Sequence, residues 1–472
     1  MRAWLSATWQ GIRSSYWFVP SLMSLIAVAL ALALIAADRR LPAEAARLFG
    51  PFAAHGPEGA RALLTTIASS MIGVAGVTFS ILIAAVAFAA GQFGPRILTT
   101  FMRDRANQLS LGTFIATFVY GLTTLAAVQG AGNGDAAFVP RLATAGGLAF
   151  GVASLGMLIH FLHHAPRSIH VSQVVAELGL ELRERLEQRF PERIGKAAER
   201  GPDAAAVPDR LSEDARPVRA TGEGYVAALS EQALLDCARE HDLIIRLIRR
   251  PGDFVSRGHA LAYVWPGARV DPGDGAAEEE RERAAHIVRA VRDAFATART
   301  RTPEQDVGLL VDQLVEIAAR ALSPGINDPF SAMAALDWLS AGLSHVARAA
   351  PPSPWRADAE GKLRVIARPS TFEDLADSVF GRLRPYFEGD RNAALHMMAV
   401  LSDLMMAAPE ASSRRHLLHH GEALRDGARI ALTHPADVAE VNRRAAVLKD
   451  LLDPARDGRR LRDGPDWAGG SA

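Results

Sequence analysis

Four long apolar stretches near the amino terminus set the strongest constraint on the fold of this chain. They cover residues 17–37, 62–90, 109–128 and 142–162, and none contains Asp, Glu, Lys or Arg. A helix needs about 20 mostly apolar residues to cross a hydrocarbon core roughly 30 Å thick. Four such runs in succession would be unusual for buried helices of a soluble protein. The sequence therefore predicts a four-span transmembrane domain over residues 1–165.

Aromatic residues before the first stretch favour an uncleaved membrane anchor over a cleaved signal peptide. Trp9, Tyr16 and Trp17 form a long aromatic preface that is typical of a membrane interface. Ala36 and Ala37 are the small residues that a signal-peptide cleavage site would require, so that alternative has some support.

Arginine residues in the loops predict the orientation of the spans. Arg96, Arg103 and Arg105 lie between the second and third stretches, which places this loop and both termini in the cytoplasm by the positive-inside rule. The first loop opposes this orientation, because it would face outward with four arginines: Arg39, Arg40, Arg47 and Arg61. The balance favours a cytoplasmic soluble region.

Small residues recur every four positions on two of the predicted spans. The second span carries Gly76, Ser80 and Ala84, and the fourth carries Gly147 and Gly151. Small side chains at this spacing form a smooth stripe on which another helix can pack closely. The stripes are explained by packing within one bundle or by an interface between subunits or a pore lining.

Hydroxyl groups share one face of the third span. Thr113, Thr117, Tyr120 and Thr124 are spaced four, three and four residues apart. Such a face indicates hydrogen bonding between helices or, alternatively, a hydrated path through the membrane. Both interpretations are kept open.

Histidines cluster at the end of the fourth span, with His160, His163 and His164 followed by His170. His160 and His164 are four residues apart and could share a metal ion. No carboxylate or thiol follows nearby in the chain before Glu177, and histidines also suit the carboxyl end of a helix. The helix-end interpretation is favoured over a metal site.

Charge and cysteine content exclude several classes of function. The chain has 52 Lys and Arg residues and 52 Asp and Glu residues, so its formal net charge is zero and nucleic acid is not an expected partner. Cys237 is the single cysteine, which excludes an intrachain disulfide and a multi-cysteine metal cluster. Its apolar neighbours predict an inert thiol in a core.

The remainder of the chain is predicted to form a cytoplasmic α+β region. We expect a helical stalk and linker over residues 166–222, a small β half-barrel over 223–268, a helical domain over 284–453 and a disordered tail over 454–472. The turn at residues 251–261 resembles that of biotinyl and lipoyl-type modules, but residues 223–268 contain no lysine to modify. No cofactor is therefore expected. The predicted fold class is a mostly α membrane protein with this smaller mixed region.

Polar residues crowd the segment 304–328: Glu304, Asp306, Asp312, Glu316, Asn327 and Asp328. Asp328 followed by Pro329 suits the start of a helix. The i,i+4 spacing of Asp312, Glu316 and Arg320 suits ion pairs on a helix surface. A divalent cation bound by Asp312 and Glu316 is the alternative interpretation.

Three separated motifs identify the chain with a known family. Residues 91–96, including Gln92, Phe93, Pro95 and Arg96, are followed by Asp104 within 103–114. The Pro-Gly-Asp-Phe-Val segment lies at 251–255, and residues 321–330 contain Pro324, Gly325, Asn327 and Asp328. Together they resemble the bacterial predicted membrane proteins called domain of unknown function 2254. The resemblance covers nearly the whole chain to about residue 405 and implies an inner-membrane protein with a cytoplasmic carboxyl region. It implies no activity.

No nucleotide-binding, nucleophile-elbow or zinc-protease motif is present in the sequence, so an enzyme is not expected. The leading hypothesis is a homo-oligomeric channel or transport-type protein whose soluble region gates or senses. The alternative is a membrane-anchored binding or scaffold module. A metal-dependent enzyme that uses the 304–328 carboxylates is the least favoured hypothesis.

Overall fold

The computed structural model describes residues 16–40, 56–94, 104–130, 138–168, 170–189, 196–197, 214–273, 276–349 and 353–452. The chain divides into two compact units, Met1–Val174 and Val175–Ala472. Pro95 and Arg96, the predicted tail at 454–472 and most of the predicted linker lie outside the described residues.

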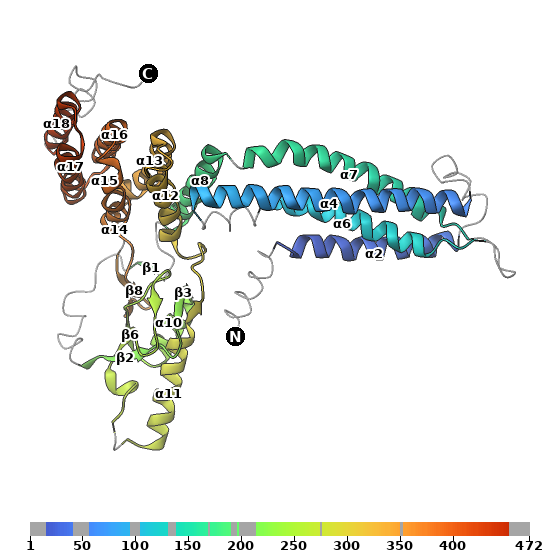
Figure 1. Cartoon of the computed structure of the whole chain (residues 1–472). Coiled ribbons are helices and arrows are strands. Elements are labelled where there is room, and N and C mark those ends of the chain that lie inside the picture. Colours follow the sequence, from blue (N-terminus) through green and yellow to red (C-terminus); the bar gives the residue numbers. More distant parts are fainter. Residues whose placement is uncertain are drawn as a thin grey trace. The chain divides into compact units, whose positions relative to one another are not determined.

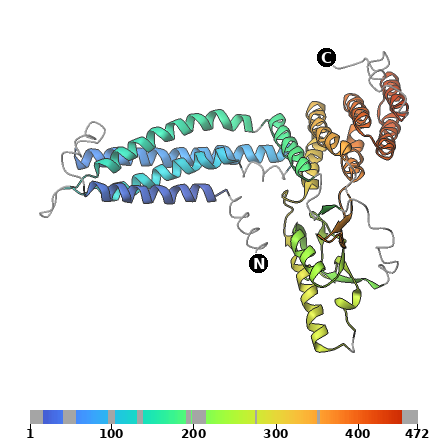
Figure 2. The same ribbon diagram turned by 180° about the vertical axis from the view of Figure 1, so that it is seen from behind.

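The first unit is a bundle of long helices that run side by side in Figures 1 and 2. They are α2 (Phe18–Asp38), α4 (Pro57–Phe93), α6 (Arg105–Ala126) and α7 (Arg141–Ser168). Among the described residues, these four helices are long and apolar enough to cross a membrane. The predicted mostly α fold with four apolar spans is confirmed.

Helix α6 occupies the centre of this bundle and contacts α2, α4 and α7. In its most apolar stretch, 50% of the residues of α6 are buried, whereas the corresponding share is 22% in each of the other three helices. Glycines allow the close approach: a Cβ on Gly121 of α6 would lie 3.3 Å from Ala68 of α4. The outer faces of the other helices expose large aliphatic side chains such as Leu25, Val77 and Val152. Lipid contact requires such outer faces.

An aspartate at the end of α2 holds the start of α7. The backbone N–H groups of Leu142 and Ala143 each donate to the carboxylate of Asp38 at 3.0 Å. The first N–H groups of a helix have no partner within it, and a negative charge there is favourable. Asp38 therefore fixes α7 against the first helix of the bundle.

The second unit contains two small sheets. The larger has the strand order β1 (Lys196–Ala197), β8 (Trp355–Ala357), β9 (Leu363–Ile366), β4 (Ile244–Leu247), β6 (Ala260–Trp265) and β2 (Arg216–Arg219). The smaller has the order β5 (Phe254–Val255), β3 (Gly224–Leu229) and β7 (Phe295–Ala298). Helices α10 (Glu231–Glu240) and α11 (Glu278–Asp293) and the short turn η2 (Gly267–Arg269) complete this part.

The sheet extends beyond the segment predicted for it. Strands β8 and β9 come from residues 355–366, within the region expected to be helical, and β9 pairs in parallel with β4. A parallel partner needs a long connection, so it can come from a distant part of the chain. Cys237 lies in the core shared by these strands and helices, as predicted, together with Leu234, Ile245 and Val365.

Helices form the rest of the second unit, and α17 and α18 lie side by side in Figures 1 and 2. Their bounds are α8 (Val171–Arg189, which contains the boundary between the units), α12 (Val307–Ala321), α13 (Pro329–Arg348), α14 (Phe372–Ala376), the π-helical turn η3 (Asp377–Gly381), α15 (Arg382–Phe387), α16 (Arg391–Ala407), α17 (Ala411–Ala431) and α18 (Pro435–Asp450).

The family motif at 321–330 forms the turn between α12 and α13. Asp328 begins α13, and its side chain accepts from the backbone N–H of Ser331 at 3.1 Å, with Pro329 in the first turn. Asn327 has a φ of 50°, the left-handed conformation that asparagine tolerates better than most residues. The predicted helix start at Asp328 is confirmed.

Candidate functional site

Buried polar side chains of the first unit concentrate on its central helix. Among the described residues, α6 buries Asn107, Gln108, Ser110, Thr117 and Thr124, whereas α4 buries Thr78 and α7 buries Thr144 and Ser154. A bilayer offers no hydrogen-bond partners, so polar groups in a membrane bundle face its interior. Polar side chains thus recur along the buried length of α6, between apolar ones such as Leu111 and Phe114, and this set from Asn107 to Thr124 is called the polar column below.

The middle of the column is joined by hydrogen bonds between helices. The hydroxyl groups of Thr117 on α6 and Ser154 on α7 lie 2.7 Å apart. The Tyr120 hydroxyl donates to the carbonyl of Ala143 at 2.8 Å, and its ring stacks on Phe150 at 4.7 Å between centroids. The structure thus places Thr117 and Tyr120 of the predicted face in contacts within the bundle.

The other two residues of that face differ from each other. Thr124 is fully buried. Thr113 is half-buried, and its hydroxyl donates to the carbonyl of Leu109 one turn earlier on the same helix. A hydrated path along this face therefore stays a prediction, and hydrogen bonding between helices explains its middle part.

One end of the column contains an aspartate–histidine pair that sequence reasoning did not find. The Asp104 side chain accepts from the backbone N–H of Ala106 at 2.9 Å and so starts α6. Its second oxygen lies 2.8 Å from Nε2 of His164 on α7. The rings of His160 and His164 stack at 5.7 Å. The missing carboxylate of the predicted histidine cluster is thus supplied 60 residues earlier in the chain.

Asn107 follows Asp104 by about one turn of α6 and is the least satisfied polar group of this end. Its side chain is 1% exposed, and among the residues that the structure describes neither the Nδ2 nor the Oδ1 atom has a hydrogen-bond partner. A buried polar group left without a partner costs about 1–3 kcal/mol. An amide that offers both a donor and an acceptor inside the bundle is the kind of group that a solute can occupy.

The two stripes of small residues have different surroundings. A Cβ on Gly147 of α7 would lie 2.9 Å from Leu64, and one on Gly151 would lie 3.5 Å from Ile67, so this stripe packs on α4. At Gly76, by contrast, no atom of the described residues lies within 4 Å of an added Cβ. Ser80 and Ala84 are exposed with it.

The exposed stripe of α4 is longer than the sequence motif suggested. Its members are spaced three or four residues apart, are all exposed and are all small: Ala62, Thr66, Ser69, Gly73, Gly76, Ser80, Ala84, Ala87 and Gly91. Gln92 and Phe93 end this helix, and their side chains lie outside the described ones. Against the part of the chain that the structure describes, this α4 stripe is an unpacked helix face along most of a membrane span.

The acidic segment of the second unit is bound by arginines. Asp306 accepts from Arg301 at 2.6 and 3.0 Å, and Asp312 pairs with both Arg301 and Arg382. Glu316 lies one turn further along α12 and is half-buried. A cation at Asp312 and Glu316 would compete with two guanidinium groups for Asp312, and this metal site stays a prediction.

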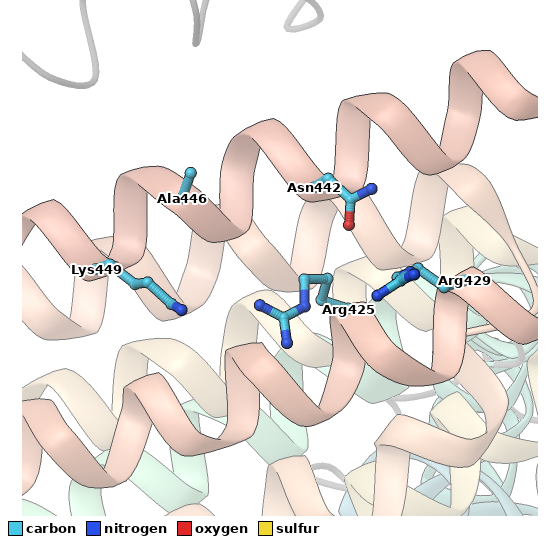
Figure 3. Close-up of a pocket in the computed structure, with 5 residues that line it drawn as sticks. All are labelled: Arg425, Arg429, Asn442, Ala446 and Lys449. Carbon is cyan, nitrogen blue, oxygen red and sulfur yellow. The ribbon is translucent and has the colours of Figure 1, made fainter.

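A basic pocket of about 380 Å³ lies between α17 and α18. Figure 3 shows the side chains of Arg425 and Arg429 on α17, facing Asn442 and Lys449 on α18. Arg425 pairs with Asp426 at 2.8 Å, and Lys449 pairs with Glu422 at 3.0 Å. These acidic partners offset much of the positive charge, so the pocket alone does not indicate a ligand.

Comparison with known proteins places these features in a family. The family model described as "Predicted membrane protein (DUF2254)" matches residues 13–403 and confirms the resemblance seen in the motifs. Uncharacterized proteins of Mycobacterium bovis and Mycobacterium tuberculosis are 30% identical over 353 residues, which cover 75% of this chain. The chain spans 64% of the length of these relatives. No solved structure matches it.

Proposed function

This chain belongs to the DUF2254 family of predicted membrane proteins, and from that premise we propose that it is an oligomeric channel or transport-type protein of the bacterial inner membrane. The observation that carries the proposal is the buried amide of Asn107, which lies one turn from the Asp104–His164 pair and has no hydrogen-bond partner within the described part of the chain. Such groups inside a membrane bundle are costly, and they mark the paths of ions and polar solutes in transport proteins.

The dimensions of the polar column fit a path across the membrane. The rise from Asn107 to Thr124 along α6 is about 26 Å at 1.5 Å per residue. The hydrocarbon core of a bilayer is about 30 Å thick. The column therefore covers most of the apolar layer, with the aspartate–histidine pair at one end. A carboxylate beside an imidazole suits a cation or a proton, and the amide suits a small polar solute.

The α4 stripe supports a homo-oligomer. Its nine residues have only hydrogen, methyl or hydroxyl-bearing side chains, which let a second helix approach closely. A second copy of the chain is the partner that we propose for this face. In this proposal the carboxyl-terminal unit lies in the cytoplasm and gates the path or senses a signal.

Flux through liposomes tests the transport proposal. Purified full-length protein should move monovalent cations or protons across the membrane, and Asn107→Leu should reduce the rate about tenfold or more, since the polar group at the path is lost. Leu122→Ala on the same helix is the matched control, because Leu122 is 44% exposed and faces away from the bundle. Absence of flux in the wild-type protein, or equal flux in Asn107→Leu, would contradict the proposal.

A membrane-anchored binding or scaffold module is the second candidate. The contacts Thr117–Ser154 and Tyr120–Ala143 favour it, because they show hydroxyl groups used for packing rather than for a path. Deletion of residues 1–165 distinguishes the two functions. A scaffold would keep its partner binding in soluble form, whereas a transport protein would lose all activity.

A further inference from the structure

Two elements of the second unit bring one carboxylate and two imidazoles together. Asp377 is the first residue of the π-helical turn η3, and His416 and His420 are four residues apart on α17. Oδ1 of Asp377 lies 2.9 Å from Nε2 of His416 and 3.0 Å from Nε2 of His420. One carboxylate oxygen and two ring nitrogens thus meet at a single point, where each Nε2–H group donates to Asp377.

This set of atoms matches the ligands of a transition metal. One oxygen of Asp377 and one ring nitrogen of each histidine all lie within 4.8 Å of one another. Neighbouring ligands of a tetrahedral zinc ion are about 3.3 Å apart when the bonds are about 2.0–2.1 Å long. Small side-chain shifts would therefore admit an ion between the three groups. Two histidines four residues apart on a helix, with one carboxylate, leave further coordination positions open.

We propose that Asp377, His416 and His420 form a binding site for one divalent transition-metal ion, with zinc as the best match. Imidazole nitrogen suits zinc, copper, iron and nickel, whereas calcium and magnesium prefer an all-oxygen shell. The proposal goes beyond transport and does not depend on it, because the site lies wholly within the second unit.

The proposed ligands differ in exposure, because His420 is buried and Asp377 is accessible to solvent. The His420 side chain is 8% exposed and packs against Phe380 of the π-helical turn, 5.7 Å between ring centroids. A metal ion would replace the proton on Nε2 of each ring, because a histidine ligand binds through a deprotonated ring nitrogen. The Asp377 side chain is 59% exposed, which gives an ion and its waters a way in.

A second hydrogen bond, between α17 and α14, fixes the position of α17 along the segment that leads into η3. Ser413 of α17 donates to Glu373 of α14 at 2.8 Å, one turn before the His416–Asp377 contact on both elements. The π-helical turn then places Asp377 opposite both histidines. Such turns are rare and occur frequently at functional sites. The ligand geometry is therefore held before any metal arrives.

Metal binding by the full-length protein tests the proposal. The protein would be purified in detergent with a tag that lacks histidine, treated with a chelator, dialysed against zinc and analysed for bound metal. We expect one additional zinc ion per chain relative to Asp377→Asn and His420→Gln, with affinity in each variant reduced about tenfold or more. His419→Gln is the matched control, because its ring lies 6.1 Å from that of His420 yet it is outside the ligand set.

A variant of the more exposed ligand His416 tests the proposal even if His420→Gln does not fold. His416 is 27% exposed, so His416→Gln removes one ligand with little effect on packing. Zinc should raise the melting temperature of the wild type and of His419→Gln but not of His416→Gln, since a ligand that binds only the folded state stabilises it. Cobalt in place of zinc should give tetrahedral absorption bands. Absence of zinc binding in the wild type, or binding that survives His416→Gln, would overturn the proposal.

Discussion

Asn107 and Thr117 are both buried polar residues of α6, yet only one of them has its hydrogen bonds satisfied. Thr117 contacts the Ser154 hydroxyl, whereas the Asn107 amide has no hydrogen-bond partner among the described residues. Replacing an unsatisfied buried group by an apolar one removes its desolvation cost, about 1–3 kcal/mol. Asn107→Leu should therefore raise the melting temperature. Thr117→Val should lower it, because a hydrogen bond between membrane helices contributes about 1 kcal/mol.

The opposite signs of these two effects separate function from folding. A variant that is more stable but moves no solute has lost a functional group rather than its structure. Thermal unfolding in detergent, followed by tryptophan fluorescence, measures both variants under one condition. Equal destabilisation by Asn107→Leu and Thr117→Val would show that Asn107 is a packing residue.

Two glycines with positive φ test how backbone strain and crowding combine. Gly252 has a φ of 96°, and a Cβ there would lie 2.5 Å from the Asp306 carboxylate, whereas Gly258 has a φ of 87° and open space around it. Gly258→Ala should cost about 1–2 kcal/mol of backbone strain alone. Gly252→Ala should cost more, because it also displaces the partner of Arg301. Denaturant unfolding gives both values, and equal costs would exclude the crowding effect.

At the scale of helices, packing of α8 on α13 relies on a glycine of each helix. A Cβ on Gly179 would lie 2.5 Å from the ring of Trp338, and Leu182 and Leu186 of α8 approach Gly342 of α13. Gly179→Ala should therefore separate the two helices and cost about 1–3 kcal/mol, the usual cost of overpacking. Unfolding followed by tryptophan fluorescence, to which Trp338 contributes, measures it. A variant as stable as the wild type would mean that Trp338 moves aside freely.

The same scale shows which elements the sequence could predict. Apolar runs without charges predicted all four long helices, since a bilayer requires that pattern, and Asp328 with Pro329 predicted the start of α13. The parallel pairing of β4 with β9 could not be predicted, because periodicity within a segment contains no information about a distant partner.

In the candidate sites too, the sequence indicated residues that are close together in the chain but not their distant partners. His164 was identified from its own cluster, but its carboxylate partner Asp104 is 60 residues away. Asp377 lies 39 residues from His416, and no local spacing joins them. His416 and His420 at i,i+4 were the available signal for the metal site, and the motif becomes specific only when the fold supplies the third ligand.

At the scale of the whole molecule, the exposed α4 stripe predicts where two copies meet. In a Cys237→Ala background, Ser80→Cys should form a disulfide-linked dimer in membranes under mild oxidation. Val152→Cys is the matched control, since it lies on α7, is 65% exposed and has large aliphatic neighbours. Small residues bring two helix backbones close enough for a disulfide, whereas a lipid-facing valine does not.

The native thiol gives an internal reference for the same experiment. Burial, followed by the charge of Glu240, raises the pKa of Cys237 to about 11, so its reactive thiolate is scarce at pH 8. Wild-type protein should therefore remain monomeric on a denaturing gel after oxidation. If Val152→Cys cross-links as readily as Ser80→Cys, the dimers reflect random collision in the bilayer. If only Ser80→Cys cross-links, α4 of one copy lies against α4 of another, and the polar column of each protomer belongs to a defined assembly.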